Sequence, residues 1–197
     1  MKKGTFLSTV LVVCFLPAAN ALDLTPHPVA GTVGNIRVNR YYFDDTGKQM
    51  AFRIDNNMTV SGTSASASFK FTDLRNADLQ ILKSPRNPEA SFVEKELEVY
   101  RANARALVPG NATDVQVDKE VSDAIPINGW KSYQFTFSYK LFGFSYRRSV
   151  TFLNYNKTEQ LVIDLSAPAP EFEIASLRGY QVINSLSEFR KELSSNT

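Results

Sequence analysis

The sequence predicts a single α+β domain built mainly from antiparallel strands. Segments in which apolar and polar residues alternate, as in half-buried strands, recur through most of the chain. Two segments, residues 88–108 and 172–186, instead repeat apolar residues at steps of three and four, which is typical of amphipathic helices. No tandem repeat and no linker composition follows residue 35, so we expect one domain.

The first 21 residues are expected to form a cleaved signal peptide of bacterial type. Residues 2–3 are basic, an apolar run covers 6–16, and 19–21 supply the small residues of a cleavage site. The apolar run is too short for a membrane span. We therefore expect a secreted protein, periplasmic or extracellular, whose mature chain begins at Leu22.

Composition argues against several kinds of chemistry. The one cysteine, Cys14, lies in the expected signal peptide, which leaves no disulfide, thiol nucleophile or cysteine-ligated metal in the mature chain. The one histidine, His27, lies between prolines in residues 22–35, which we interpret as an extended leader. A serine hydrolase triad needs a positioned histidine, and zinc or iron sites need several. We expect no enzyme, no metal and no cofactor.

Charge gives no support for nucleic-acid binding. The chain has 22 Lys and Arg against 20 Asp and Glu, and the two lysines of the expected signal peptide account for the whole excess. Proteins that bind nucleic acids usually carry a basic surface that neutralises phosphates. We therefore expect no nucleic-acid partner.

Four strands are expected before the first helix, and they cover residues 35–43, 51–54 with 58–60, 64–71, and 78–84. The third is the clearest, because alanine and phenylalanine alternate there with serine and lysine. Asp44–Asp45 and Asp55–Asn57 carry oxygen ligands that suit calcium, but neither run has the spacing of a calcium loop. We interpret both as turns.

The helix expected over 88–108 has recognisable ends. Asn87 suits the cap, Pro88 suits the first helical position, and Pro109-Gly110 ends the helix. Its apolar stripe consists of Val93, Leu97, Tyr100, Ala104 and Leu107. The stripe of the second helix consists of Phe172, Ala175, Gly179, Val182 or Ile183, and Leu186. Gly179 would allow a close approach to a sheet, and residues 191–197 are interpreted as a frayed tail.

Between the helices we expect a strand over 115–121, a long hairpin over 133–152 and a strand over 159–165. With Lys140–Gly143 as the hairpin loop, the expected facing pairs are Tyr139 with Phe144, Phe137 with Tyr146, and Tyr133 with Val150. All the rings then share one face, with Gln, Thr and Ser on the other. We interpret the rings as core, because a stacking platform for nucleic acid would expose rings and cations together.

The tip of this hairpin is the candidate binding site. Leu141 and Phe142 are expected to protrude, with Phe144 next to the loop and the cations Lys140 and Arg147 on either side. An apolar pair between cations suits a partner protein or anionic lipid head groups. The alternative, in which the tip folds back on its own domain, stays open.

Four stretches carry a family resemblance: ASFVEKELEVYRANARAL, INGWKSYQFTFSYKLFGFSYRRSVTFLN, EQLVIDLSAP and INSLSEF. Their order and kind resemble the PsbP-like superfamily over about residues 50–190. The resemblance implies a PsbP-like domain over 36–190, folded as an α/β/α sandwich around an antiparallel sheet. It also implies a non-enzymatic exported protein that binds or stabilises a larger assembly, and it brings no catalytic residues.

Three functions follow as hypotheses. The first is an exported, non-catalytic accessory or interaction protein, with an envelope protein or a membrane surface as partner. Its expected contact residues are Lys140, Leu141, Phe142, Phe144 and Arg147. The second is a periplasmic carrier of a small apolar ligand, with a pocket between helix 88–108 and the sheet. The third is a carboxylate-based hydrolase, which needs two acids that converge in a cleft.

Overall fold

The computed structural model describes residues 22–29, 32–33, 36–37, 39–86 and 92–189. The predicted signal peptide, the predicted tail and the predicted helix cap at Asn87 and Pro88 lie outside the described residues.

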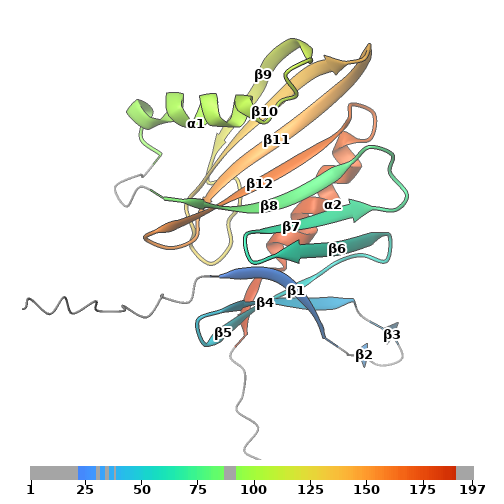
Figure 1. Cartoon of the computed structure of the whole chain (residues 1–197), viewed down its shortest axis with the longest axis vertical. Coiled ribbons are helices and arrows are strands. Elements are labelled where there is room, and N and C mark those ends of the chain that lie inside the picture. Colours follow the sequence, from blue (N-terminus) through green and yellow to red (C-terminus); the bar gives the residue numbers. More distant parts are fainter. Residues whose placement is uncertain (1–21, 30–31, 34–35, 38, 87–91, 190–197) are drawn as a thin grey trace, which may run out of the picture.

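Seven strands form one sheet in the order β6-β7-β8-β12-β11-β10-β9, and every neighbouring pair is antiparallel (Figure 1). The strands are β6 (Met58–Thr63), β7 (Ser66–Phe71), β8 (Asp78–Pro85), β9 (Thr113–Ser122), β10 (Ser132–Leu141), β11 (Phe144–Asn154) and β12 (Glu159–Pro168). Strands β6 to β8 and β9 to β12 are two successive meanders, and the pairing of β8 with β12 joins them. The predicted mainly antiparallel sheet is confirmed.

A second sheet of four strands packs beside the β6 edge, in the order β1-β4-β5-β13 (Figure 1). Its strands are β1 (Asp23–Val29), β4 (Arg40–Asp45), β5 (Lys48–Arg53) and β13 (Ser187–Phe189), and β2 (Thr32–Val33) pairs separately with β3 (Ile36–Arg37).

This second sheet corrects the prediction that residues 22–35 are a leader outside the domain. Leu22 and Leu24 are 2% and 0% exposed and belong to the main core. The prolines that suggested a leader, Pro26 and Pro28, lie in β1 at the edge of its sheet, where a strand tolerates proline.

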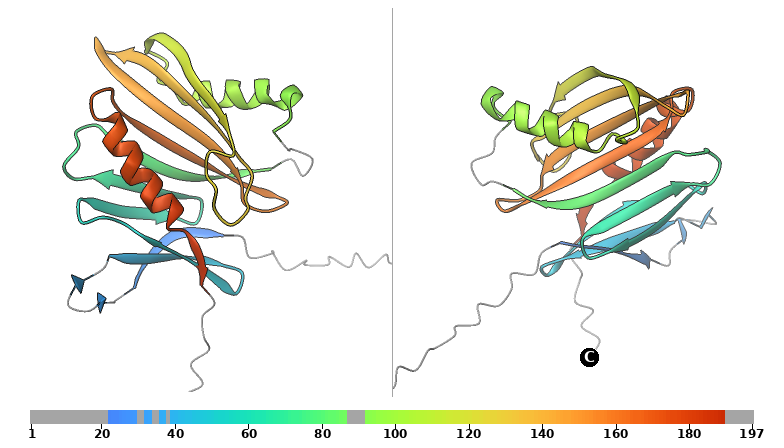
Figure 2. Two further views of the ribbon diagram at one scale, coloured as in Figure 1. Left: turned by 180° about the vertical axis from the view of Figure 1, so that it is seen from behind. Right: turned by 45° about the horizontal axis from the view of Figure 1, so that its top comes forward.

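The helices α1 (Glu94–Ala106) and α2 (Phe172–Asn184) lie on opposite faces of the seven-stranded sheet (Figure 2). One core cluster lies between α1 and the sheet, and a larger cluster connects α2, the other face and the second sheet. Over the described residues, the structure is thus a single domain of mostly antiparallel sheets with two helices. The four-stranded sheet is an addition to the architecture that the resemblance implies.

Helix α1 begins later than the sequence predicts. Phe92 and Val93 are described and are not helical, and Phe92 has a φ of +55°. In this conformation the Phe92 ring lies 5.0 Å from the Tyr100 ring and 6.1 Å from the Tyr133 ring, measured between centroids. The aromatic contact therefore replaces a first helical turn at these two residues.

The buried face of α2 agrees with the predicted stripe, since its members Phe172, Ala175, Gly179, Val182, Ile183 and Leu186 are all buried. A Cβ atom on Gly179 would lie 2.7 Å from Cδ1 of Leu165. Glycine is therefore what lets this helix approach β12 so closely.

The register of the β10–β11 hairpin differs from the predicted one by two residues. The observed facing pairs are Tyr139 with Tyr146, Phe137 with Arg148, and Phe135 with Val150. The loop is a two-residue turn at Phe142–Gly143, where φ is +50° and +82°, as a type I′ hairpin turn requires. A shift of two residues keeps every side chain on its face. The rings within the strands therefore still share one face, and the prediction that they are core is confirmed for all of them except Phe144, which is exposed.

The opposite, polar face of the hairpin is buried as well, beneath α2. Gln134, Thr136, Ser149 and Thr151 are all buried. Gln134 Nε2 donates to Thr151 Oγ1 at 3.0 Å and also to the hydroxyl of Tyr180 on α2. These hydrogen bonds compensate the polar side chains of this face for the loss of water.

Two alanine substitutions on the same hairpin test the inward packing of the rings. Phe137→Ala removes a ring that is 0% exposed and should lower the free energy of unfolding by about 3–5 kcal/mol. Phe142→Ala removes a ring that is 82% exposed and should change it by less than about 0.5 kcal/mol. Chemical unfolding of both variants measures the difference, and equal losses would contradict the observed packing.

Candidate functional site

The turn of the β10–β11 hairpin projects at one corner of the sheet and exposes two aromatic side chains (Figure 1). Phe142 is 82% exposed and Phe144 is 71% exposed. Leu141, which was expected to protrude, instead packs against the core cluster under α1. The protruding pair is therefore Phe142 with Phe144. In the observed register, Leu141 and Phe144 form the last pair of the β10–β11 ladder before the turn.

Phe142 occupies a backbone conformation that favours other residues. Its φ is +50°, in the left-handed region where glycine, asparagine and aspartate are common and bulky side chains are rare. The turn at Asn128–Gly129 has nearly the same angles, +49° and +68°, with the expected asparagine. Strained residues of this kind cluster at binding sites. Folding alone gives no reason for an exposed phenylalanine at position 142.

The two cations of the hairpin tip (residues 140–147) both have carboxylate partners. Lys140 Nζ lies 2.9 Å from Asp114 Oδ2 on β9, and this hydrogen bond raises the pKa of Lys140. Arg147 lies 2.8 Å from Glu173 Oε1 and 3.5 Å from Asp118 Oδ2. The cations that the sequence places beside the rings are therefore engaged with other parts of the domain.

These contacts fix the hairpin tip to the rest of the fold. The Arg147 guanidinium lies over the ring of Phe172, the first residue of α2, at 4.7 Å from the centroid. The backbone N–H of Ala169 donates to the carbonyl of Ser145 at 2.9 Å. The two exposed rings are thus presented by a braced β-ribbon, which limits the entropy that binding would cost.

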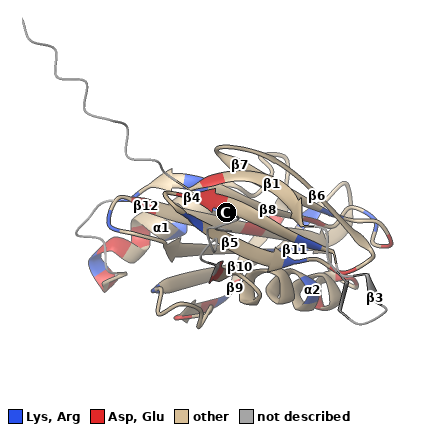
Figure 3. Cartoon of the chain, turned by 90° about the horizontal axis from the view of Figure 1, so that it is seen from below, with Lys and Arg blue, Asp and Glu red and all other residues tan. Residues whose placement is uncertain are grey.

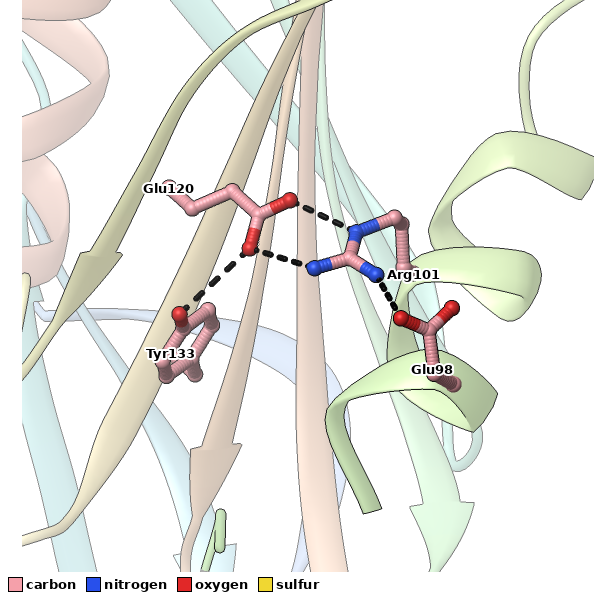
Figure 4. Close-up of polar contacts among 4 residues, drawn as sticks. All are labelled: Glu98, Arg101, Glu120 and Tyr133. Carbon is pink, nitrogen blue, oxygen red and sulfur yellow. Dashed lines mark hydrogen bonds and ion pairs between the residues drawn. The ribbon is translucent and has the colours of Figure 1, made fainter. Parts of the chain in front are cut away.

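A second polar cluster joins α1 to the sheet edge (Figure 4). Arg101 Nε and Nη2 donate to the two carboxylate oxygens of Glu120 at 2.6 and 2.9 Å, and Arg101 Nη1 donates to Glu98. The hydroxyl of Tyr133 lies 3.5 Å from Glu120 Oε2. Sequence reasoning missed this cluster, although Glu98 and Arg101 have the i,i+3 spacing of a helical ion pair.

Glu98 and Glu120 are two acids that converge, as the hydrolase hypothesis requires, but one guanidinium lies between them. The hydrogen bond from Arg101 lowers the pKa of Glu120, whereas a general acid needs a raised pKa. Burial raises the pKa of Tyr133, whose hydroxyl donates to Glu120. The chemistry of this cluster is that of a bidentate ion pair that attaches α1 to β9.

A buried ion pair attaches the other end of α1. Arg148 lies on the ring-bearing face, opposite Phe137, and binds Asp164 at 2.7 and 2.9 Å. Its Nη1 also donates to the carbonyl of Leu107, directly after α1. Arg148 therefore satisfies both a buried carboxylate and a helix-end carbonyl that has no partner within the helix.

The described cavity lies under α2, on the opposite side of the sheet from the pocket that the carrier hypothesis places near α1. Leu79, Thr151, Ile163, Gly179 and Tyr180 are among its lining residues, and its volume is about 10 Å³. That volume holds about one water molecule. It gives no support to a carrier of apolar ligands.

The acidic turns are occupied by protein contacts. Asp55 Oδ1 accepts from the N–H of Asn57 at 2.6 Å, and its Oδ2 lies 3.3 Å from Arg178 Nε. Asp45 accepts from the hydroxyl of Tyr155. Among the described residues, no group of three or more His, Cys, Asp or Glu side chains is placed to hold a metal ion. None of the helices in the described ranges has the length and apolar character that a membrane crossing requires.

The Arg101–Glu120 pair predicts a loss of stability in acid. Because the folded-state pKa of Glu120 lies below its unfolded value, the pair stabilises the fold at neutral pH and less so as pH falls below about 4.3. Glu120→Gln should lower the free energy of unfolding by about 1–2 kcal/mol at pH 7 and by less in acid.

Unfolding by urea at pH 7 and at about pH 3, below the ordinary pKa of a glutamate, measures this effect, with the exposed Glu94→Gln on α1 as the control. An equal loss for Glu120→Gln at both pH values would show that the ion pair does not contribute in this way.

The comparisons with known proteins bear on the fold. No protein-family model matches the chain, and no curated protein matches its sequence. Similar solved structures include the cyanobacterial PsbP protein (CyanoP) of Synechocystis sp. PCC 6803, with a TM-score of 0.54 and 15% identity over 82% of this chain and 98% of that one.

Two further similar structures come from other bacteria. LpqN of Mycobacterium tuberculosis, a protein involved in cell envelope biogenesis, has a TM-score of 0.51 and 12% identity, covering 81% of this chain and 98% of that one. A Pseudomonas aeruginosa protein of unknown function, named a putative regulator, has a TM-score of 0.50 and 14% identity, covering 67% of this chain and 97% of that one. Identities this low establish the fold alone. The chain therefore has a PsbP-like fold.

Proposed function

We propose that this chain is an exported, non-catalytic accessory protein that binds a partner assembly at or near the cell envelope through its hairpin tip. The observation that carries the proposal is Phe142, which is 82% exposed in a left-handed turn position that disfavours it. Together with Phe144 it forms an aromatic pair of the kind that anchors protein interfaces.

Export is supported by the sequence, and the burial of Leu22 agrees with the proposed cleavage site. Residues 1–21 have the three parts of a signal peptide. Leu22, the first residue after the proposed cleavage site, is buried, and its carbonyl accepts a hydrogen bond from Lys83 Nζ at 2.6 Å. The fold therefore uses the proposed mature chain from its first residue. The similarity to LpqN, which is involved in cell envelope biogenesis, agrees with this compartment.

A binding role without catalysis is supported by the pairing of the buried and converging carboxylates with arginines. The acids that converge near α1 share the guanidinium of Arg101, and buried Asp164 is paired with Arg148. Both arrangements pair the carboxylates with a guanidinium and attach α1 to the sheet. The hairpin tip, in contrast, exposes apolar surface that contributes nothing to the core.

Replacing Phe142 with asparagine separates binding from folding. Asparagine suits the left-handed position, so Phe142→Asn should leave the free energy of unfolding unchanged or raise it by about 1 kcal/mol. It should also reduce capture of the partner, because the anchor is gone. Capture is measured by photo-cross-linking in the intact cell envelope, from a benzophenone side chain in place of Phe144.

Val99→Asn is the matched control, since it removes an apolar side chain that is 62% exposed on α1, away from the hairpin. It should leave capture unchanged. Normal capture by the folded Phe142→Asn variant, or no capture by the parent protein, would rule out the hairpin tip as the binding site.

A further inference from the structure

We infer that the hairpin tip binds a protein pocket that is apolar inside and basic at its edge, rather than an anionic lipid surface. This inference rests on the proposed function and specifies the chemistry of its partner. It follows from the charges that surround the two exposed rings and from the rigidity of the turn that presents them.

Carboxylates outnumber cations around the rings. The cations Lys140 and Arg147 are in contact with three carboxylates, those of Asp114, Asp118 and Glu173. The ion pairs therefore carry one net negative charge at neutral pH. The side chains of Asp114 and Glu173 are 59% and 82% exposed, so a partner would meet their carboxylates.

This charge disfavours a membrane as the partner. Segments that bind anionic head groups carry clusters of unpaired Lys and Arg, and the attraction grows with each added cation. Here both cations near the rings are paired. In the rest of the described chain, acidic and basic segments are interspersed, as on α1 (Figure 3). The described chain therefore has no large basic surface that could attract an anionic membrane in place of unpaired cations at the tip.

The same charge favours a protein pocket with a basic edge. Electrostatic complementarity between partners fixes their orientation and speeds their encounter. The rings suit the apolar interior, because they project from a braced two-residue turn whose ladder continues to the Leu141–Phe144 pair. Strand β9 supports this ladder up to the pairing of Lys140 with Thr113. A rigid aromatic projection of this kind fits a concave site better than a flat one.

Reversing one charge distinguishes the two kinds of partner. Glu173→Lys changes the net charge around the rings from negative to positive without altering either phenylalanine. If the partner pocket is basic at its edge, photo-cross-linking from position 144 to the captured protein should fall about fivefold or more. If the partner is an anionic membrane, attachment should instead increase.

Glu94→Lys is the matched control. Glu94, like Glu173, is an exposed glutamate in the first turn of a helix, so both changes have the same effect on a helix dipole. Glu94 lies near Tyr133, at the end of β10 away from the turn, and its charge acts on that residue. Its reversal should leave capture unchanged.

Flotation with vesicles of pure phosphatidylglycerol and of pure phosphatidylcholine completes the test. We expect the parent protein to remain unbound by both, and capture of a protein to be reduced by Phe142→Asn and by Glu173→Lys but not by Glu94→Lys. Vesicle binding that increases with Glu173→Lys, or protein capture that this variant leaves unchanged, would overturn the inference about the partner while the tip remained the binding site. Absence of any contact from position 144 would overturn the proposed function itself.

Discussion

The one-sided packing of the rings in β10 and β11 is the constraint on which the rest of the structure depends. Phe135, Phe137 and Phe152 are fully or almost fully buried under α1, and the ring of Tyr100 on α1 lies 4.9 Å from that of Phe152. Helix α1 itself contributes only Leu97 and Ala104 as buried residues. Because α1 has so little apolar surface of its own, the aromatic face and the two arginine ion pairs must hold it in place.

The opposite face of the same strands solves a different packing problem. Its buried side chains in these two strands are polar except for Leu153, so α2 is not held there by large rings. Instead Gly179 lets the helix approach β12, and Tyr180 reaches the polar layer to bond Gln134. The sheet is therefore covered by two unlike interfaces, an aromatic one under α1 and one under α2 that combines aliphatic side chains with hydrogen bonds.

Local alternation was sufficient to predict most strands and the faces of their side chains, but it could not determine the hairpin register. A slip of two residues leaves every face unchanged, so only the turn distinguishes the two pairings. That turn is Phe142–Gly143, which lacks the asparagine that usually marks a type I′ hairpin. In β1, prolines concealed a strand whose Leu24 is buried. The paired state of Lys140 and Arg147 was also beyond prediction, because it depends on β9 and α2, which are distant in sequence.

Comparison with the turn at Asn128–Gly129 shows why the exception at the tip is informative. At Asn128–Gly129 the residue type agrees with the backbone, and the Asn128 side chain donates to the carbonyl of Leu186 at 3.4 Å, so that turn serves the fold. At Phe142–Gly143 the backbone has similar φ angles, but phenylalanine is disfavoured in this conformation, and its side chain makes no contact with the core. At most positions of a natural protein, the residue type favours the backbone conformation that the fold requires, and exceptions concentrate at functional sites. The register that misled the sequence prediction and the site proposed for binding therefore have the same cause, a phenylalanine where folding would favour asparagine.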